Sequence, residues 1–172
     1  LSSLPACTAI NSSAVPAASP AVTPPAIEYP HIKRPNLVVS DIERALSIYR
    51  DILGLTASDI STSSSESYSY PVFKIPRGTE IRGVTLHEPG EKRVLALTEL
   101  ASLDLPVPSN APHMSAVVIG VTDLAGKFEA IEALGLDTTE PKTASGADFD
   151  FVEQAFVDFD GHLIVLYEVL GN

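Results

Sequence analysis

An internal repeat is the feature that most limits how this 172-residue chain can fold. Two segments, beginning near Leu37 and Ile119, share a short apolar run, an aspartate and a Leu-Gly-Leu ending. The aspartates, Asp41 and Asp123, are 82 positions apart, and the two Leu-Gly-Leu endings are 81 positions apart. A repeat of this length indicates two copies of one supersecondary unit that bury their apolar faces together.

The elements of each copy follow from local patterns. A β-branched run, at residues 35–39 and again at 117–121, predicts a buried strand. In the first copy Ser40 and Glu43 predict a capping box, and an apolar stripe at helical spacing ends at Gly54. In the second copy Asp123 and Gly135 play these roles. Further strands are predicted at 70–75, 81–87 and 93–98 in the first copy, and at 137–141, 149–157 and 162–169 in the second. Each copy is therefore a predicted β-α-β-β-β unit.

The N-terminal segment differs in composition from the rest of the chain. Residues 1–30 contain six of the 14 prolines, many alanines and serines, and one charged residue, Glu28. This composition predicts a disordered tether at residues 1–28 and a folded domain at 29–172, with module one at 31–100, a linker at 101–112 and module two at 113–169.

Within the tether, the segment from Leu4 to Cys7 resembles the end of a bacterial lipoprotein signal. A lipidated Cys7 would hold the domain at a periplasmic or cell-envelope membrane surface, as a peripheral lipoprotein. If Cys7 is instead an ordinary free cysteine, we expect a cytoplasmic protein.

Composition excludes several classes of function. The 22 acidic residues against 11 Lys and Arg give a net charge of −11, which disfavours binding to nucleic acid. One cysteine cannot form a disulfide framework or a four-cysteine metal site. No apolar run approaches the roughly 18 residues that a membrane span requires.

At this point the residues resemble a known family. The paired pattern, with the segment Asn36–Gly54 and the closing turn Phe156–Gly161, is similar to the vicinal-oxygen-chelate superfamily of glyoxalases, bleomycin-resistance proteins and extradiol dioxygenases. Phe159 stands where proline is usual in that turn. The resemblance implies an α+β fold in which two β-α-β-β-β modules form a cupped mixed sheet. It also implies a homodimer, because relatives often pair modules across a dimer.

Family enzymes usually bind a divalent metal through one side chain on the first strand and one on the last strand of each module. The resemblance places these four ligands at Arg34, Ala96, Ala116 and Val165. Arginine has no lone pair to donate, and the other three side chains have no donor atom. We therefore expect neither the family metal nor any other cofactor.

A displaced metal site is the alternative. His31 and His113 occupy equivalent places, three residues before the vacant first-strand positions, and the remaining candidates near strand ends are His87, His162, Glu99 and Glu168. A shift of three residues turns a strand side chain to the opposite face unless a bulge intervenes. The competing interpretation is that these histidines lie at a solvated rim.

Alternation along the strands predicts an apolar floor with four polar side chains, Arg34, Asn36, Thr98 and Tyr167. A concave apolar surface with a few convergent polar groups is typical of a small-molecule site. Simple filling of the half-barrel is the alternative.

Two charged pairs are interpreted as structural. Lys92 and Arg93 are expected at a solvated junction between turn and strand, and Asp158 and Asp160 at a hairpin turn.

Three functions remain open from the sequence. The first is metal-free binding of a small molecule with an anionic or carbonyl group. The second is a lyase or dioxygenase with an atypical metal site, so whether the protein is an enzyme is left undecided. The third is a structural or partner-binding module without a ligand site.

Overall fold

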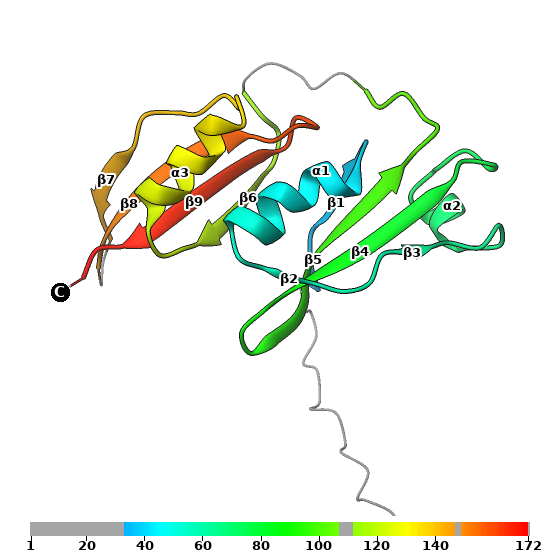
Figure 1. Ribbon diagram of the computed structural model, residues 1–172, viewed down its shortest axis with the longest axis horizontal. Helices are drawn as coiled ribbons and strands as arrows, with labels where there is room; N and C mark the ends of the chain where they lie inside the picture. Colours follow the sequence, from blue (N-terminus) through cyan, green and yellow to red (C-terminus); the bar gives the residue numbers. More distant parts are fainter. Residues whose placement is uncertain (1–32, 107–111, 147–148, 172) are drawn as a thin grey trace, which may run out of the picture. The chain divides into compact units, whose positions relative to one another are not determined.

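The computed structural model describes residues 33–106, 112–146 and 149–171 (Figure 1). The predicted tether of residues 1–28, including Cys7, and the residue His31 lie outside these ranges. Within them, no helix is both long and apolar enough to cross a membrane.

Module one contains a mixed sheet and three short helical segments. Its elements are β1 (Asn36–Val39), α1 (Ile42–Leu46), the π-helical η1 (Ser47–Ile52), β2 (Thr56–Ala57), β3 (Ser61–Thr62), α2 (Ser69–Val72), β4 (Ile81–Glu88) and β5 (Glu91–Leu100). The strand order is β1-β5-β4-β2, with β3 also paired to β4. β1 runs parallel to β5 and places Asn36 opposite Ala96.

Module two repeats this arrangement with β6 (Ala116–Gly120), α3 (Leu124–Ala133), β7 (Lys142–Ser145), β8 (Asp150–Val157) and β9 (Leu163–Val169). Its strand order, β6-β9-β8-β7, matches that of module one, with the first strand again parallel to the last. The predicted α+β fold with two β-α-β-β-β modules is therefore confirmed. The strands form two separate mixed sheets, one in each module.

The predicted capping box in module one is wrong. The residue that caps α1 is Asp41, whose carboxylate accepts a hydrogen bond from the backbone N–H of Arg44 at 3.0 Å. The hydroxyl of Ser40 donates instead to Asp160 in module two, at 2.6 Å. The Ser40 oxygen accepts from the guanidinium of Arg44 at 2.6 Å rather than from a backbone N–H of the helix. Glu43 is exposed in the first turn.

Two predicted strands are also wrong in part. Residues 70–72 lie in α2 and residues 73–75 follow it without forming a strand, and Tyr70 and Ile75 bury together against Ile81 and Leu100 rather than alternating across a sheet. In module two, the region 137–141 contributes only an isolated bridge at Thr138, and the strand follows at β7.

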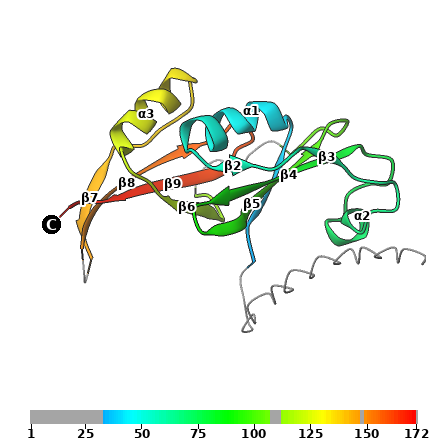
Figure 2. The same cartoon turned by 60° about the horizontal axis from the view of Figure 1, so that its bottom comes forward.

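The core is shared between the modules. Figure 2 shows α1 and α3 on the same side of the strands. Fully buried side chains from both helices and both sheets form one apolar cluster, including Ile42, Leu46, Ile131, Phe156 and Leu166. Burial of each of these residues stabilises the fold by about 1.5–3 kcal/mol relative to exposure, and the cluster that buries them includes side chains of both modules.

Polar contacts tie the closing turn of module two to the start of module one. The buried hydroxyl of Tyr49 donates to Oδ2 of Asp158 at 2.7 Å. The other oxygen, Oδ1, accepts from the backbone N–H groups of Asp160 and His162. The imidazole Nε2 of His162 lies 2.8 Å from the carbonyl oxygen of Val38 on β1. Burial and the nearby Asp158 carboxylate raise the pKa of Tyr49 well above its usual value, so its phenol remains a donor.

We predict that Tyr49→Phe lowers the free energy of unfolding near neutral pH by about 1–2 kcal/mol, because the buried carboxylate loses a donor. In the parent protein stability should also fall above about pH 10, where an unfolded tyrosine ionises and the folded one does not. The variant should lack this contribution to the alkaline loss.

Urea unfolding at several pH values measures both effects. Tyr68→Phe is the matched control, because Tyr68 is 71% exposed. Equal stability of Tyr49→Phe and the control would contradict the prediction.

Candidate functional site

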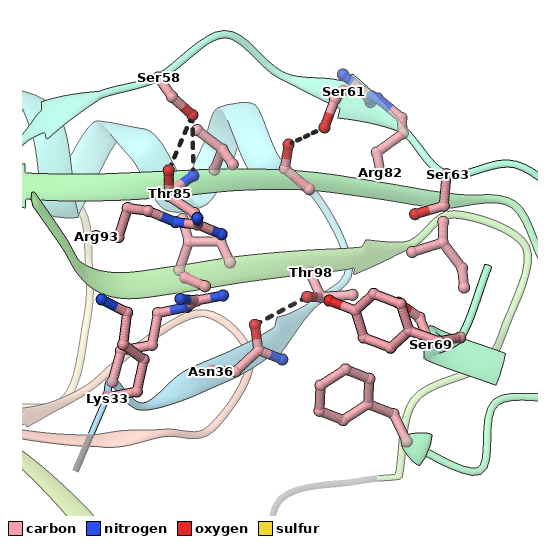
Figure 3. Close-up of a pocket in the computed structure, with 18 residues that line it drawn as sticks. Lys33, Asn36, Ser58, Ser61, Ser63, Ser69, Arg82, Thr85, Arg93 and Thr98 are labelled. Carbon is pink, nitrogen blue, oxygen red and sulfur yellow. Dashed lines mark hydrogen bonds between the residues drawn. The ribbon is translucent and has the colours of Figure 1, made fainter. Parts of the chain in front are cut away.

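A cleft with a volume of about 530 Å³ lies in module one. Its floor is the face of β1, β5 and β4 that points away from α1, and its walls come from residues 58–63 and from α2 (Figure 3). We call it the module-one cleft. Leu37 and Val39 point into the core, so alternation along β1 turns Asn36 toward the cleft.

Three of the four predicted ligand-binding residues line this cleft: Arg34, Asn36 and Thr98. The hydroxyl of Thr98 donates to the side-chain oxygen of Asn36 at 3.0 Å, which leaves the amide NH₂ group of Asn36 available as a donor (Figure 3). Arg34 is half-buried. It lies two residues before Asn36 and therefore on the same face of the strand. Ala96, opposite Asn36, provides the small apolar floor beneath them.

The fourth predicted residue, Tyr167, does not line the module-one cleft. It is in β9, opposite Gly120 of β6, and its ring lies so close that a Cβ at Gly120 would be 3.1 Å from it. Tyr167 therefore covers a glycine in the sheet of module two. Alternation along the strand identified the face of Tyr167 correctly. That face belongs to the sheet of module two, however, and not to the sheet that forms the module-one cleft.

Basic residues dominate the charge of the cleft. Among its described lining residues, Lys33, Arg34, Arg82 and Arg93 are basic and none is acidic, although acidic residues outnumber basic ones twofold in the sequence. The guanidinium of Arg82 is 2.9 Å from the buried carboxylate of Glu99. In the described residues, the other three basic side chains lie within ion-pair distance of no carboxylate.

The interpretation of Arg93 as a residue of a solvated turn junction is incomplete. Arg93 is exposed but lines the cleft, and its backbone is left-handed, with φ of 65°. This conformation accompanies a register shift of β4 against β5 between Leu86 and Glu88. The backbone N–H of Arg93 donates to Nδ1 of His87 at 2.8 Å. A bulge of this kind redirects a side chain, and no sequence pattern signals it.

Comparison with known proteins agrees with this architecture. The family model described as the Glyoxalase/Bleomycin resistance protein/Dioxygenase superfamily matches residues 29–166. The chain belongs to this superfamily. Among curated proteins, none matches the sequence significantly.

Solved structures share the superfamily fold at low sequence identity. A glyoxalase family protein from Bacillus cereus has a TM-score of 0.66 at 15% identity, and the match covers 84% of this chain and 97% of that one. A glyoxylase/bleomycin resistance protein/dioxygenase domain from Frankia has a TM-score of 0.56 at 16% identity, covering 83% and 93%. The fosfomycin resistance protein FosX from Listeria monocytogenes, solved with Mn(II) and sulfate, has a TM-score of 0.53 at 14% identity, covering 84% and 95%.

The four positions that the resemblance assigns to a metal do not fit one in this chain. Arg34 and Ala96 lie in the module-one cleft, whereas Ala116 lines a second cavity and Val165 lies within β9. None of these side chains offers a lone pair to a cation. Among the described residues, no three His, Cys, Asp or Glu side chains are grouped so that they could hold a metal ion.

The residues proposed for a displaced metal site have other contacts. His113 and His162 line the second cavity, between the start of β1 and that of β6, and His162 is bonded to β1. Glu99 accepts from the backbone N–H of Ile42, and Glu168 accepts from those of Asp123 and Leu124. The two glutamates thus cap α1 and α3 at equivalent points of the repeat, a role that the sequence analysis missed.

We predict that Glu99→Ala lowers the free energy of unfolding by about 2–3 kcal/mol, because it leaves the buried N–H of Ile42 without an acceptor and Arg82 without its partner. Glu99→Gln retains an acceptor and should cost less.

Chemical denaturation measures the difference. Glu91→Ala, at the exposed start of the same strand, is the control. A loss no greater for Glu99→Ala than for Glu91→Ala would show that the cap is dispensable.

Proposed function

We propose that this domain binds a small organic molecule through an anionic or carbonyl oxygen in the module-one cleft, without a resident divalent metal. The observation that carries the proposal is the half-buried Arg34, which stands at a family metal position inside a cleft whose described charged residues are all basic.

An arginine at this position can supply the electrophilic function of a cation by another route. A guanidinium presents several N–H donors in a fixed plane and matches the oxygen pair of a carboxylate or phosphate. Asn36 lies on the same face and directs its NH₂ group toward the cleft, since its oxygen is held by Thr98. A ligand oxygen bound by Arg34 would therefore find a second, fixed donor nearby.

The surroundings favour binding over mere filling of the sheet surface. Hydroxyl groups line the cleft on its β3–β4 side, with Ser58 and Thr85 bonded to each other and Ser61 bonded to the carbonyl of Gly83. These groups accept or donate without adding charge. They are suited to the polar atoms of a small ligand in a site of ordinary size.

We predict that the purified, dialysed protein contains well below one divalent metal ion per chain, because its family metal positions have no donor atoms. Elemental analysis measures the metal content. About one ion of Ni, Zn, Fe or Mn per chain, lost in a His31→Ala/His113→Ala variant, would contradict this prediction and favour the enzyme with a displaced metal site.

We also predict that Arg34→Ala lowers the affinity for cleft ligands about tenfold or more, because a charge-assisted hydrogen bond is lost. Compounds that raise the melting temperature of the parent protein in a chemically diverse screen provide the ligands, and calorimetry gives their affinities.

Arg50→Ala is the control, because Arg50 is an exposed arginine that pairs with Asp51 outside the cleft. If Arg34→Ala binds every such compound as tightly as the parent, the proposed function is wrong.

A further inference from the structure

The module-one cleft has two chemically different ends. Figure 3 shows Lys33 and Arg93 near one end and Ser69, at the start of α2, near the other. Between them lie Asn36 and Thr98, joined by their hydrogen bond. The floor strand β5 therefore leads from a basic end to an end formed by α2 and its neighbours.

The basic end gathers three cations. Asn36 lies opposite Ala96, and the N–H of Ala96 donates to the carbonyl of Pro35 at 3.2 Å. Extending this parallel register by two residues places Arg34 opposite Val94, the residue that follows Arg93. The positive charges of Lys33, Arg34 and Arg93 repel one another within the cleft, and an oxyanion bound among them would relieve that repulsion.

The position of Arg93 is imposed by a strained backbone. A left-handed φ is uncommon for a residue with a long side chain and persists only where surrounding contacts hold it. Here the contact is the hydrogen bond from the N–H of Arg93 to Nδ1 of His87, the residue at the bulge. Continued regular alternation would turn position 93 toward the core side shared by Leu95 and Leu97.

The opposite end exposes aromatic rings beside the hydroxyl groups of Ser63 and Ser69. Tyr68 and Phe73, on either side of α2, line the cleft and are 71% and 48% exposed. Beside them Ile81 continues the apolar surface into a small core that includes Tyr70 and Leu100. Large aromatic side chains exposed together at the wall of a cleft are suited to contact an apolar ligand.

We propose that the ligand of this cleft is an amphipathic organic acid, with its carboxylate or equivalent oxyanion among Lys33, Arg34 and Arg93 and its apolar, ring-bearing body toward Tyr68 and Phe73. This inference rests on the proposed function and specifies its ligand class and orientation. His87 is a positioning residue, which acts by holding Arg93 toward the cleft.

The length of the floor limits the ligand. Five residue steps along β5 lead from Arg93 to Thr98, which corresponds to about 16 Å of extended strand. The long basic side chains reduce the distance that a ligand must span between the two ends of the cleft. An acid with an extended alkyl chain between carboxylate and ring can therefore contact both ends. 6-Phenylhexanoate has this form, and 6-phenylhexan-1-ol is its uncharged counterpart.

Titration calorimetry with these two probes and with inorganic phosphate tests the proposal. The acid should bind about tenfold more tightly than the alcohol, and added salt should weaken only the acid. Lys33→Ala and Arg93→Ala should lower the affinity for the acid and leave that for the alcohol unchanged. Phe73→Ala should lower both, and Lys92→Ala, a charge control at an exposed neighbouring position, should change neither.

The role of His87 has its own pair of variants. His87→Ala removes the acceptor and should weaken the acid about as much as Arg93→Ala does. His87→Asn offers an oxygen near the place of Nδ1 and should restore binding. Circular dichroism and melting temperatures identify any variant that fails to fold, and in that case the comparison of acid with alcohol on the parent protein decides the matter.

Equal affinity for acid and alcohol would overturn the proposal, and so would phosphate that displaces the acid at comparable concentration, because the apolar half would then contribute nothing. If the acid does not bind while other screened compounds bind in an Arg34-dependent manner, the ligand class is wrong and the proposed function stands. If those compounds bind without depending on Arg34, the proposed function also fails.

Discussion

The joining of the two modules depends on the hydrogen bonds of one buried carboxylate, that of Asp158. Taking a carboxylate out of water is costly unless its oxygens are fully bonded. Asp158 meets this condition with two backbone N–H groups of its own turn and with the hydroxyl of Tyr49 from module one. The third donor exists only when the modules are together. The turn therefore favours the arrangement in which the shared apolar core is closed and β1 is held in place to form the floor of the cleft.

The two modules share one backbone arrangement but differ in the side chains that surround it. Glu99 and Glu168 cap equivalent helices, yet Glu99 also pairs with Arg82, whereas Val152 is the residue opposite Glu168. Of the 11 Lys and Arg residues, only Lys127 and Lys142 lie in module two. Module one therefore carries nearly all of the positive charge available for anion recognition, in a protein that is strongly acidic as a whole. Local basic character within an acidic chain distinguishes a selective site from general attraction of anions.

Part of the candidate site could be predicted from strand alternation. Arg34, Asn36 and Thr98 share one face because the period of two is a local property of each strand, and adjacent strands align in register. Tyr167 obeys the same alternation but belongs to the other sheet. Arg93 could not be predicted, because its direction is set by a bulge and by a hydrogen bond to His87 across the hairpin.

By itself the sequence determined the two β-α-β-β-β units, the Asp123 cap and the ends of both helices at glycine, since each depends on side-chain period or on backbone preferences within a few residues. The tertiary structure decided which distant residues the side chains of these units contact. Ser40 bonds to Asp160 rather than capping its helix, and Tyr70 of the short helix α2 buries with Ile75 against Ile81 and Leu100. These outcomes depend on partners that are distant in sequence, and their energies outweigh local preferences of a fraction of a kcal/mol per residue.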